Sequence, residues 1–417
     1  MNSTRSNDKP SNLNPKGRYR ALVIMTSAQI GGAVIQQGFG SLAPFIVEYF
    51  GINKAQLGAS FTLIMLGSAL TVGLGGMFVD RFGERNMTIF AGVGIFVTIS
   101  IGALMPSYPG LIAWLFIMGL TYGAVTPAGG RAILTWFTHD RGFAMSIRQM
   151  GVPIGAIVGG FMLPLVASHW SYRIALFCGA VLSLVMTSGS ALLYHDATDE
   201  TFPAPRFKQV FGGVRSIAFD RRTIYLALTC MVLAISQQTM VGFLALTAVT
   251  RAHLSVALAA AAFIVAQSAS MLGRLVWGRA SDVVFGGDRV MPMALSCAIL
   301  VFAAMGLAVT FPGGELLLFA SAFAYGFTAA GWNGLFGAAM AEIGGARFAG
   351  SAIGIGLTSV FFAGACGPLA FGAFADAFGL SSAWWAIAAL AAIGVIPAVL
   401  ARRAFAAAAL HERAALG

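Results

Sequence analysis

Charged residues are scarce in this chain of 417 residues, making up 10% of it against 58% for hydrophobic residues. A soluble globular protein carries about 25% charged residues, so the composition excludes that class. All 15 acidic residues fall in tails, in loops or at the ends of long apolar stretches, and none lies in the middle of one. The five histidines are placed in the same way. The sequence therefore shows no row of titratable groups that could relay a proton through an apolar layer.

Cysteines and catalytic motifs are also sparse. The four cysteines, Cys178, Cys230, Cys297 and Cys366, stand singly in separate apolar stretches, which fits neither a disulfide framework nor a metal site. No Gly-x-x-x-x-Gly-Lys-Ser/Thr occurs, so nucleotide hydrolysis is not the expected energy source. No pairing of a nucleophile with a base and no cofactor motif is visible. We expect neither an enzyme nor a protein with a cofactor or a metal.

Long stretches without charge fill most of the chain. A helix needs about 20 apolar residues to cross the hydrocarbon layer, and it must satisfy its own backbone hydrogen bonds there. One stretch, Asn86–Gly130, is 45 residues long and is interrupted at Ser107–Gly110, so it reads as two spans. The other ten are Ala21–Val47, Ala55–Val79, Gln149–Tyr172, Ile174–Tyr194, Thr223–Thr250, Ala252–Gly273, Val290–Gly314, Leu316–Ala341, Phe348–Ala375 and Ala377–Ala401. The pattern predicts an all-α membrane protein with twelve transmembrane helices.

The positive charges are distributed unevenly over the loops of this arrangement. If the helices alternate in direction, twenty of the 25 Lys and Arg fall on one side, and the opposite side receives only Lys54, Arg173 and Arg251. Such a bias marks the cytoplasmic side, so both termini are expected in the cytoplasm and the protein in the cell's inner membrane. The N-terminus lacks the ordered regions of a signal peptide, so the first helix is expected to be retained. The net charge of +10 therefore reports topology and does not indicate a nucleic-acid partner.

The chain contains an internal repeat. Gly76…Asp80 is repeated as Gly278…Asp282 at an offset of 202, Gln36-Gln37 as Gln237-Gln238 at 201, and Tyr122-Gly123 as Tyr325-Gly326 at 203. Nearly constant offsets indicate two homologous halves of six helices, a repeat arrangement found in secondary transporters. The predicted organisation is a disordered cytoplasmic N-terminus (1–20), a six-helix bundle (21–194), a cytoplasmic linker (195–222), a pseudo-symmetric six-helix bundle (223–401) and a cytoplasmic tail (402–417).

One loop identifies a family resemblance. Gly76-Met-Phe-Val-Asp80-Arg81-Phe-Gly83-Glu-Arg85 meets every fixed position of Gly-x-x-x-Asp-Arg-x-Gly-x-Arg, the signature between helices 2 and 3 of the major facilitator superfamily. A weaker copy, Gly278…Asp282, follows helix 8. The resemblance extends from about Arg20 to Arg402 and implies the major facilitator fold. It also implies a gating role for Gly76, Asp80, Arg81, Gly83, Arg85, Gly278 and Asp282, with an ordinary solvated loop as the alternative.

Within the superfamily, different segments of the chain resemble different branches. Gly273-Arg274-Leu-Val-Trp-Gly278 is similar to the Arg-x-x-x-Gly of monocarboxylate carriers, where that Arg contacts the substrate carboxylate, and the region after Glu48 resembles organic-anion carriers. Met145-Ser-Ile-Arg148-Gln-Met-Gly-Val-Pro153 is similar instead to the cyanate and nitrite-like branch. Both branches imply a secondary active transporter that moves a small anion by rocker-switch alternating access. The expected mode is symport, with a proton as the candidate coupling ion. The alternative is an exporter of neutral or amphipathic compounds, of the drug-efflux type.

Three arginines are candidate anion contacts, because an ionisable group inside a membrane helix is by default functional. They are Arg131 near the end of helix 4, Arg148 in helix 5 and Arg274 near the end of helix 8. A planar guanidinium can make two parallel hydrogen bonds to a carboxylate. No acid lies at the same depth, so an anionic substrate would complete the ion pair. The alternative at each position is a side chain that reaches the cytoplasmic headgroups along its aliphatic stem.

Polar residues near the middle of helices 1, 4, 7 and 10 complete the predicted site. Buried amides must find partners, and the amide pairs lie on two helices that line the central cavity in the resembled family. The candidate substrate contacts are Gln36, Gln37, Gln237, Gln238, Tyr122, Tyr325, Trp332 and Asn333. Hydrogen bonds between helices, or packing in the case of the aromatic residues, are the alternatives. The expected partners are a small anion and membrane lipid, and the chain is expected to be a monomer.

Overall fold

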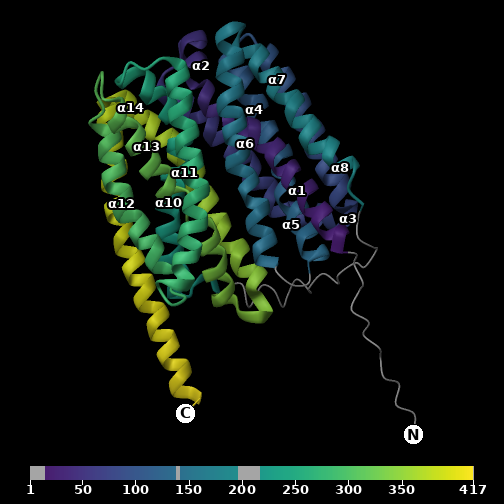
Figure 1. Ribbon diagram of the computed structural model, residues 1–417, viewed down its shortest axis with the longest axis vertical. Helices are drawn as coiled ribbons and strands as arrows, with labels where there is room; N and C mark the ends of the chain where they lie inside the picture. The colour runs from purple at the N-terminus through teal and green to yellow at the C-terminus, as the bar shows by residue number, and fades with distance from the viewer. Residues whose placement is uncertain (1–14, 138–140, 196–216, 417) are drawn as a thin grey trace.

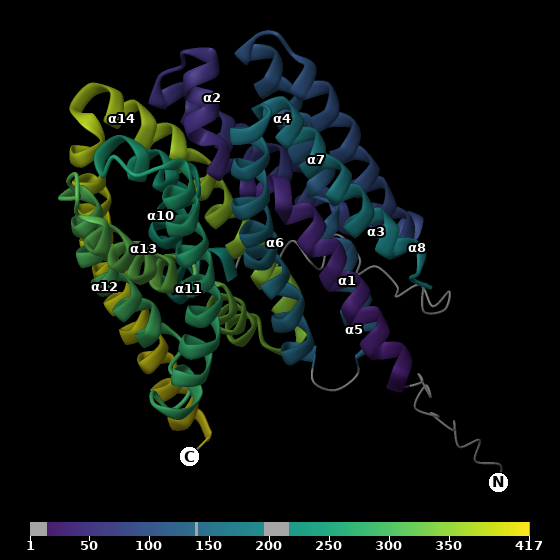
Figure 2. The same cartoon turned by 45° about the horizontal axis from the view of Figure 1, so that its top comes forward.

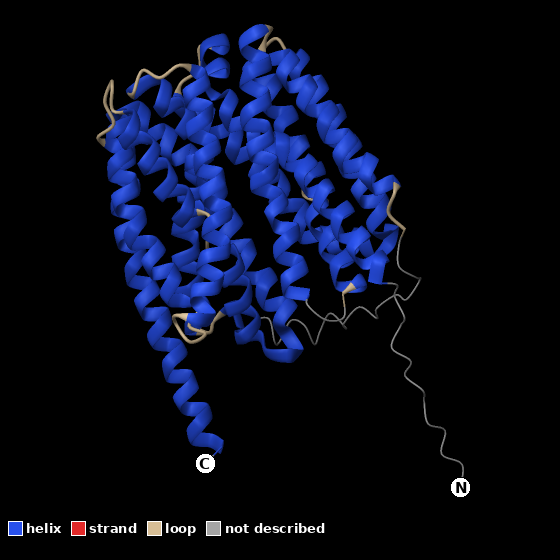
Figure 3. Ribbon diagram, viewed as in Figure 1, coloured by secondary structure: helices blue, strands red, loops and turns tan. Residues whose placement is uncertain are grey.

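Nearly every described residue of the computed structural model is helical. The structure describes residues 15–137, 141–195 and 217–416, and no strand occurs among them (Figure 3). The helices form two bundles side by side, one from each half of the chain (Figure 1). The structure therefore confirms the predicted all-α membrane fold of two six-helix bundles.

The element bounds follow the chain order. The first half contains α1 (Pro15–Gln36), the 3₁₀ turn η1 (Gly38–Leu42), α2 (Ala43–Phe50), α3 (Lys54–Leu104), α4 (Tyr108–Tyr122), α5 (Val125–Trp136), α6 (Arg141–His169), α7 (Tyr172–Leu184), the π-turn η2 (Val185–Gly189) and α8 (Ser190–Leu192). The second half contains α10 (Arg221–Arg251), α11 (Val256–Val283), α12 (Val290–Ala308), α13 (Glu315–Ala329) and α14 (Asn333–Leu416).

These elements account for twelve crossings. Ten segments of the described residues are long and apolar enough to span a membrane, and the last of them, Gly356–Ala408, has 53 residues. A backbone φ of 86° at Gly379, in the left-handed region, divides this segment into two spans. The remaining crossing is made by α13 together with the first part of α14. In the same way, α3 is two helices joined at Gly83, whose φ of 79° and ψ of 163° are not helical.

The predicted interruption at Ser107–Gly110 is a helix boundary. α3 ends at Leu104, and the hydroxyl of Ser107 accepts a hydrogen bond from the Gly110 N–H at 3.4 Å, which caps α4. Pro109 stands in the first turn of α4, where its missing N–H has no consequence.

Some helix ends differ from the predicted boundaries. α1 begins at Pro15, within the segment expected to be disordered, and Arg20 there donates from Nη2 to the carbonyl of Leu193 at 3.1 Å. α14 continues as a helix to Leu416 through the predicted tail. Residues 1–14 and most of the predicted linker, 196–216, lie outside the described residues. Hydropathy marks only the apolar part of a membrane helix, so it does not show where the helix continues beyond that part.

The Gly/Pro-rich part of α6 packs directly against α1. At Gly155 and Gly159 the backbone of α6 lies so close to the carbonyls of Ile30 and Val34 that a Cβ would collide with them. Small residues at such positions let membrane helices approach closely. This packing fixes α6 beside α1 and thereby sets which side of α6 faces the second half.

The two halves meet at one end of the molecule, which we call the α2 end. The start of α1 and the end of α14 lie at the opposite end, which we call the C-terminal end (Figure 2). At the α2 end the carboxylate of Asp376 in α14 accepts hydrogen bonds from the backbone N–H groups of Lys54 at 3.0 Å and Ala55 at 2.7 Å. The Lys54 ammonium lies 3.4 Å from the same carboxylate. An acid from the second half thus occupies the positive N-terminus of α3 in the first half.

Candidate substrate cavity

A cavity of about 120 Å³ lies between the two halves. Its wall is formed by α1, α3, α4, α5 and α6 from the first half and by α10, α11 and α14 from the second. Pockets for drug-sized ligands have volumes of roughly 300–1,000 Å³, so this space suits a small molecule.

Amides dominate the polar part of the wall. Arg274 is the one charged side chain among the described residues that line the cavity, and no Asp or Glu is among them. The amide side chains are Gln29, Gln36, Gln37, Gln149, Gln237, Gln238 and Asn333. The wall can therefore present one full positive charge and many hydrogen-bonding groups, without a carboxylate to repel an anion.

The guanidinium of Arg274 is held across the interface between the halves. Its Nε donates to the carbonyl of Ala330 at 3.1 Å, within the second half. Its Nη1 donates to the carbonyl of Gln149 in α6 at 3.0 Å, in the first half. Both acceptors are neutral, so the charge of Arg274 is not cancelled by either contact. Nη2 makes no hydrogen bond to any described residue, which leaves this donor for a ligand.

Met65 joins the repeated glutamines of the two halves. Gln36 and Gln238 donate from Nε2 to the Met65 sulfur, at 3.4 and 2.7 Å. The Oε1 atoms of both glutamines are buried and have no partner among the described residues, and the same holds for the indole Nε1 of Trp332. Unpaired buried polar groups are uncommon in native proteins and call for an explanation. Because these atoms lie around a cavity, a ligand that forms hydrogen bonds with them would explain why they have no protein partner.

Arg148 lies behind the cavity wall. Its side chain is 1% exposed, and it is not part of the lining. Its Nη2 donates to Gln29 Oε1 at 2.7 Å and to the carbonyls of Val125 and Thr126 at 3.1 and 3.0 Å. Gln29 in turn donates from Nε2 to the Tyr122 hydroxyl at 3.0 Å, and both of these side chains do line the cavity. A direct contact between Arg148 and a bound anion would require this layer to move.

Comparisons with known proteins identify the family. A sequence model described as Major Facilitator Superfamily matches residues 25–364. The chain belongs to the major facilitator superfamily. It is a multi-pass membrane transporter and not an enzyme, as the sequence predicted.

Relatives and solved structures agree with this placement. An uncharacterized MFS-type transporter of Mycobacterium tuberculosis is 26% identical, over 91% of this chain and 85% of the relative. The oxalate:formate antiporter of Oxalobacter formigenes is 26% identical over 40% of this chain and 39% of its own, and the gallate transporter of Pseudomonas putida 25% over 41% and 39%. A bacterial homolog of the human lysosomal transporter Spinster, in an inward-facing and unoccupied conformation, has a TM-score of 0.77 at 15% identity, covering 94% of this chain and 98% of that one.

Most of the substrate contacts that the sequence proposed lie in the cavity wall. Gln36, Gln37, Gln237, Gln238, Tyr122, Trp332, Asn333 and Arg274 all line it. Tyr325 does not, because it is fully buried and donates from its hydroxyl to the carbonyl of Ser236 at 3.1 Å. Its ring packs edge-on against Trp384 at 5.6 Å between centroids. Tyr325 thus serves helix packing in this structure.

Arg131 lies beside the superfamily signature loop and not in the cavity. Its Nε lies 3.2 Å from a carboxylate oxygen of Glu84, and its Nη1 donates to the carbonyl of Val79 at 3.0 Å. Glu84 is 5% exposed and occupies a variable position of the signature. This pair joins α5 to the turn at Gly83.

The first copy of the signature is described only in part. The side chain of Asp80 and the surroundings of Gly76 lie outside the described residues. Arg81 is exposed, with its guanidinium 5.5 Å from the ring centroid of Phe82. Arg85 donates to the carbonyl of Leu192 at 3.4 Å, at the end of α8. The gating role of this loop therefore remains a prediction.

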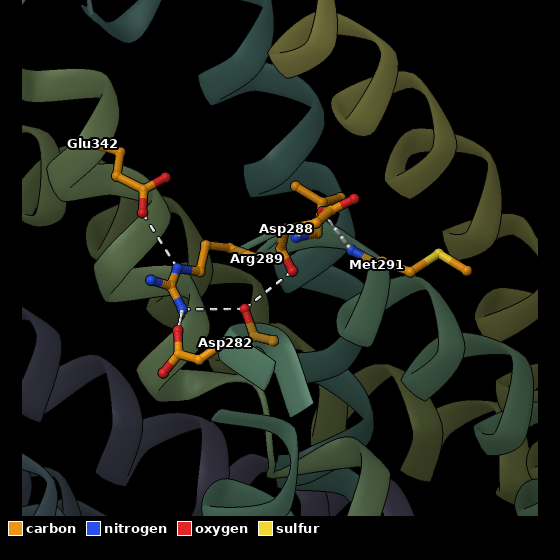
Figure 4. Close-up of polar contacts among 7 residues, drawn as sticks. Asp282, Asp288, Arg289, Met291 and Glu342 are labelled. Carbon is orange, nitrogen blue, oxygen red and sulfur yellow. Dashed lines mark hydrogen bonds and ion pairs between the residues drawn. The ribbon is translucent and has the colours of Figure 1, made fainter. Parts of the chain in front are cut away.

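The second copy forms an ion-pair cluster inside the second half (Figure 4). Arg289 donates to Asp282 from Nη1, and its Nε lies 3.2 Å from Glu342 in α14. Burial lowers the pKa of Arg289, but the hydrogen bonds that it donates to Asp282 and Glu342 outweigh this effect, so its pKa is raised above the usual value. Gly278 has open space where a Cβ would stand. In this structure Arg289 thus joins Asp282 of α11 to Glu342 of α14. The gating role of Asp282 and Gly278 stays a prediction.

Sequence reasoning missed several residues of the site. Gln29 stands seven residues before Gln36, so both fall on one face of α1, and this spacing could have identified it. Gln149 directly follows Arg148, yet it is Gln149 that reaches the cavity. Met65 and Asp376 carried no signal, because a lone methionine or a carboxylate at a helix end has no distinctive pattern.

Proposed function

We propose that this protein is a secondary active transporter that carries a small organic anion, such as a carboxylate, through the cavity at Arg274. The observation that carries the proposal is the charge of the wall: one guanidinium with a free donor, many amides, and no described acidic side chain. An anion bound there would pair with Arg274 and could accept a further hydrogen bond from Trp332 Nε1. A cationic substrate would meet Arg274 without any compensating acid.

Two named relatives support the same substrate class. The oxalate:formate antiporter and the gallate transporter carry, by their names, carboxylates. Each is matched over about two fifths of its length. Independently of these relatives, the guanidinium and the amides of the cavity wall are suited to bind a carboxylate.

Transport is proposed to follow the rocker-switch route, with both termini in the cytoplasm of a cell whose inner membrane holds the protein. The contacts of Asp376 with Lys54 and Ala55 would then close the outer side. The backbones of the two halves also pack closely beside this contact, since the Gly372 backbone lies against the Lys54 carbonyl with no room for a Cβ. Opening to the outside would break these contacts. The loop with Asp80 and Arg81 would make the corresponding closure on the cytoplasmic side.

Uptake by reconstituted vesicles tests the proposal. A panel of labelled carboxylates and small inorganic anions would be offered with and without an imposed pH gradient. We expect saturable uptake of at least one anion, and uptake that rises with an inwardly directed proton gradient indicates proton symport. Efflux of a lipophilic cationic dye without transport of any anion would favour the alternative exporter function instead.

A further inference from the structure

A second, separate recess lies at the C-terminal end of the molecule, between the start of α10 and the last part of α14. It has a volume of about 560 Å³ and lies away from the substrate cavity, with which it shares no residue. Its lining is basic and apolar: Arg221, Arg222, Arg403, Tyr225 and Leu400, three alanines, and the single acid Asp220. We call it the basic groove.

The one acid of the basic groove, Asp220, is paired with Arg222. Asp220 caps α10 by accepting from the Arg222 N–H at 2.7 Å, and its other oxygen lies 2.8 Å from Arg222 Nη2. Although burial would raise it, hydrogen bonds from Arg222 lower the pKa of Asp220, so the pair is ionised at neutral pH. Arg221 and Arg403 are exposed and make no hydrogen bond or ion pair with any described residue. Two positive charges therefore face one recess without a partner.

Apolar side chains continue from these arginines along the same helix faces. On α10, Ile224 and Leu228 follow Arg221 at intervals of three and seven residues and are 39% and 44% exposed. On α14, Val399 and Ile396 precede Arg403 by four and seven residues and are 41% and 61% exposed. Residues at these intervals share one side of a helix. Each wall of the basic groove thus passes from a guanidinium to lipid-facing hydrocarbon.

We infer that the basic groove binds an anionic glycerophospholipid. The phosphodiester would lie between Arg221 and Arg403, and the acyl chains would run along the apolar stripes toward the middle of the membrane. A recess of this kind between helices, basic at the headgroup level, fits a lipid phosphate better than a soluble anion, because only a lipid also covers the adjoining hydrocarbon. The small side chains of the three alanines leave space for the headgroup. The proposal does not depend on which substrate the cavity takes.

Native mass spectrometry of the full chain, titrated with phosphatidylglycerol or phosphatidylcholine, tests the inference. We expect tight binding of phosphatidylglycerol and at least tenfold weaker binding of phosphatidylcholine. Each lipid-contacting basic residue contributes about fivefold in affinity. Arg221→Gln and Arg403→Gln should therefore each weaken phosphatidylglycerol binding by about fivefold, and the double variant by about 25-fold. Arg279→Gln is the matched control, because Arg279 is an exposed arginine at the same end of the molecule but outside the groove.

Three outcomes would overturn the inference. The first is equal binding of the two lipids by the native chain. The second is native affinity for phosphatidylglycerol in the double variant, which would mean that the lipid binds elsewhere. The third is displacement of the lipid by inorganic phosphate at equal concentration, which would make the groove a site for a soluble anion. Unfolding midpoints measured in phosphatidylcholine should be the same for all variants, so a loss of binding reports the groove and not misfolding.

Discussion

At the scale of single residues, burial separates two arginines that the sequence presents alike. Arg274 lines the cavity and keeps one nitrogen free of protein partners, whereas Arg148 spends its Nη2 on three acceptors inside the first half. Successive residues of an α-helix point about 100° apart, so Gln149 reaches the cavity while Arg148 points into the bundle. We therefore propose Arg274 as the direct anion contact and Arg148 as a positioning residue that holds Gln29.

Arg148→Met should lower the stability of the protein. The substitution leaves the carbonyls of Val125 and Thr126 and the oxygen of Gln29 without this donor, and each such acceptor costs about 1–3 kcal/mol when buried. We expect an unfolding midpoint in detergent that is several degrees below the native value, with Arg279→Met unchanged. A native midpoint combined with lost anion binding would instead support the direct contact that the sequence suggested.

There is a physical reason why the sequence predicts some residues of the site and not others. Gln36 and Gln237 could be placed at the cavity because they lie in the middle of membrane helices, where a polar group must find a partner. Tyr325 satisfies the same rule but finds its partner in the Ser236 carbonyl. Hydropathy reports depth in the membrane, and it does not report which neighbour a side chain faces. That choice is made by helix packing, to which residues hundreds of positions apart contribute.

At the scale of elements, the contact between α3 and α14 joins the two halves at the α2 end. The first three N–H groups of α3 are all satisfied, two by Asp376 and the third by Asn53, which caps the helix from its own half. Helix breaks such as Ser107–Gly110 could be predicted, because caps and prolines are local signals. The Asp376 contact could not, since its partners are 322 and 321 residues away in the chain.

Asp376→Ala should open the α2 end. It removes the acceptor for two backbone N–H groups and the partner of Lys54, while the interior of each half keeps its contacts. Spin labels at the exposed Tyr49 and Phe378 positions, one on each half, would report their separation by pulsed electron resonance. We expect a larger share of long distances than in the native background. Asp376→Asn keeps a hydrogen-bond acceptor at this position. Its distance distribution should therefore lie between those of the native background and of Asp376→Ala.

An unchanged distance distribution in Asp376→Ala would show that the close packing of Gly58 and Gly372 against the opposite half closes this end without the carboxylate. In that case Gly372→Val, which places a side chain against the Lys54 carbonyl, should open it. If neither substitution changes the distances, the α2 end is not a gate.

At the scale of the whole molecule, the duplication and the charge bias together set the architecture. The repeat offsets predicted two bundles, and both are present (Figure 1). The cavity lies between them, where the repeated glutamine pairs meet at Met65. Arg274 has no charged counterpart in the first half, since its repeat position is Val72, which also lines the cavity. The scaffold is thus symmetric while the charge of the site comes from one half.

The charge bias predicts that both termini are cytoplasmic. A reporter fused after Gly417 should be active only if it is one that works in the cytoplasm. A fusion with a reporter that requires export should stay inactive at the same position. Activity of the exported reporter would reverse the topology, and with it the assignment of the α2 end to the outside and of the basic groove to the cytoplasmic leaflet.

Uptake by vesicles that contain Arg274→Gln measures whether the cavity binds its anion through this arginine. The variant keeps a polar side chain, although a shorter one, and removes its charge. A charge-assisted hydrogen bond contributes about 1.5–3 kcal/mol, or roughly 10- to 150-fold in affinity. For the anion that the native protein carries, we predict at least a tenfold rise in half-saturating concentration, partial recovery in Arg274→Lys, and native values in the Arg279→Gln control. Native half-saturation in Arg274→Gln would contradict the account, because the cavity would then bind its substrate without the one charge in its wall.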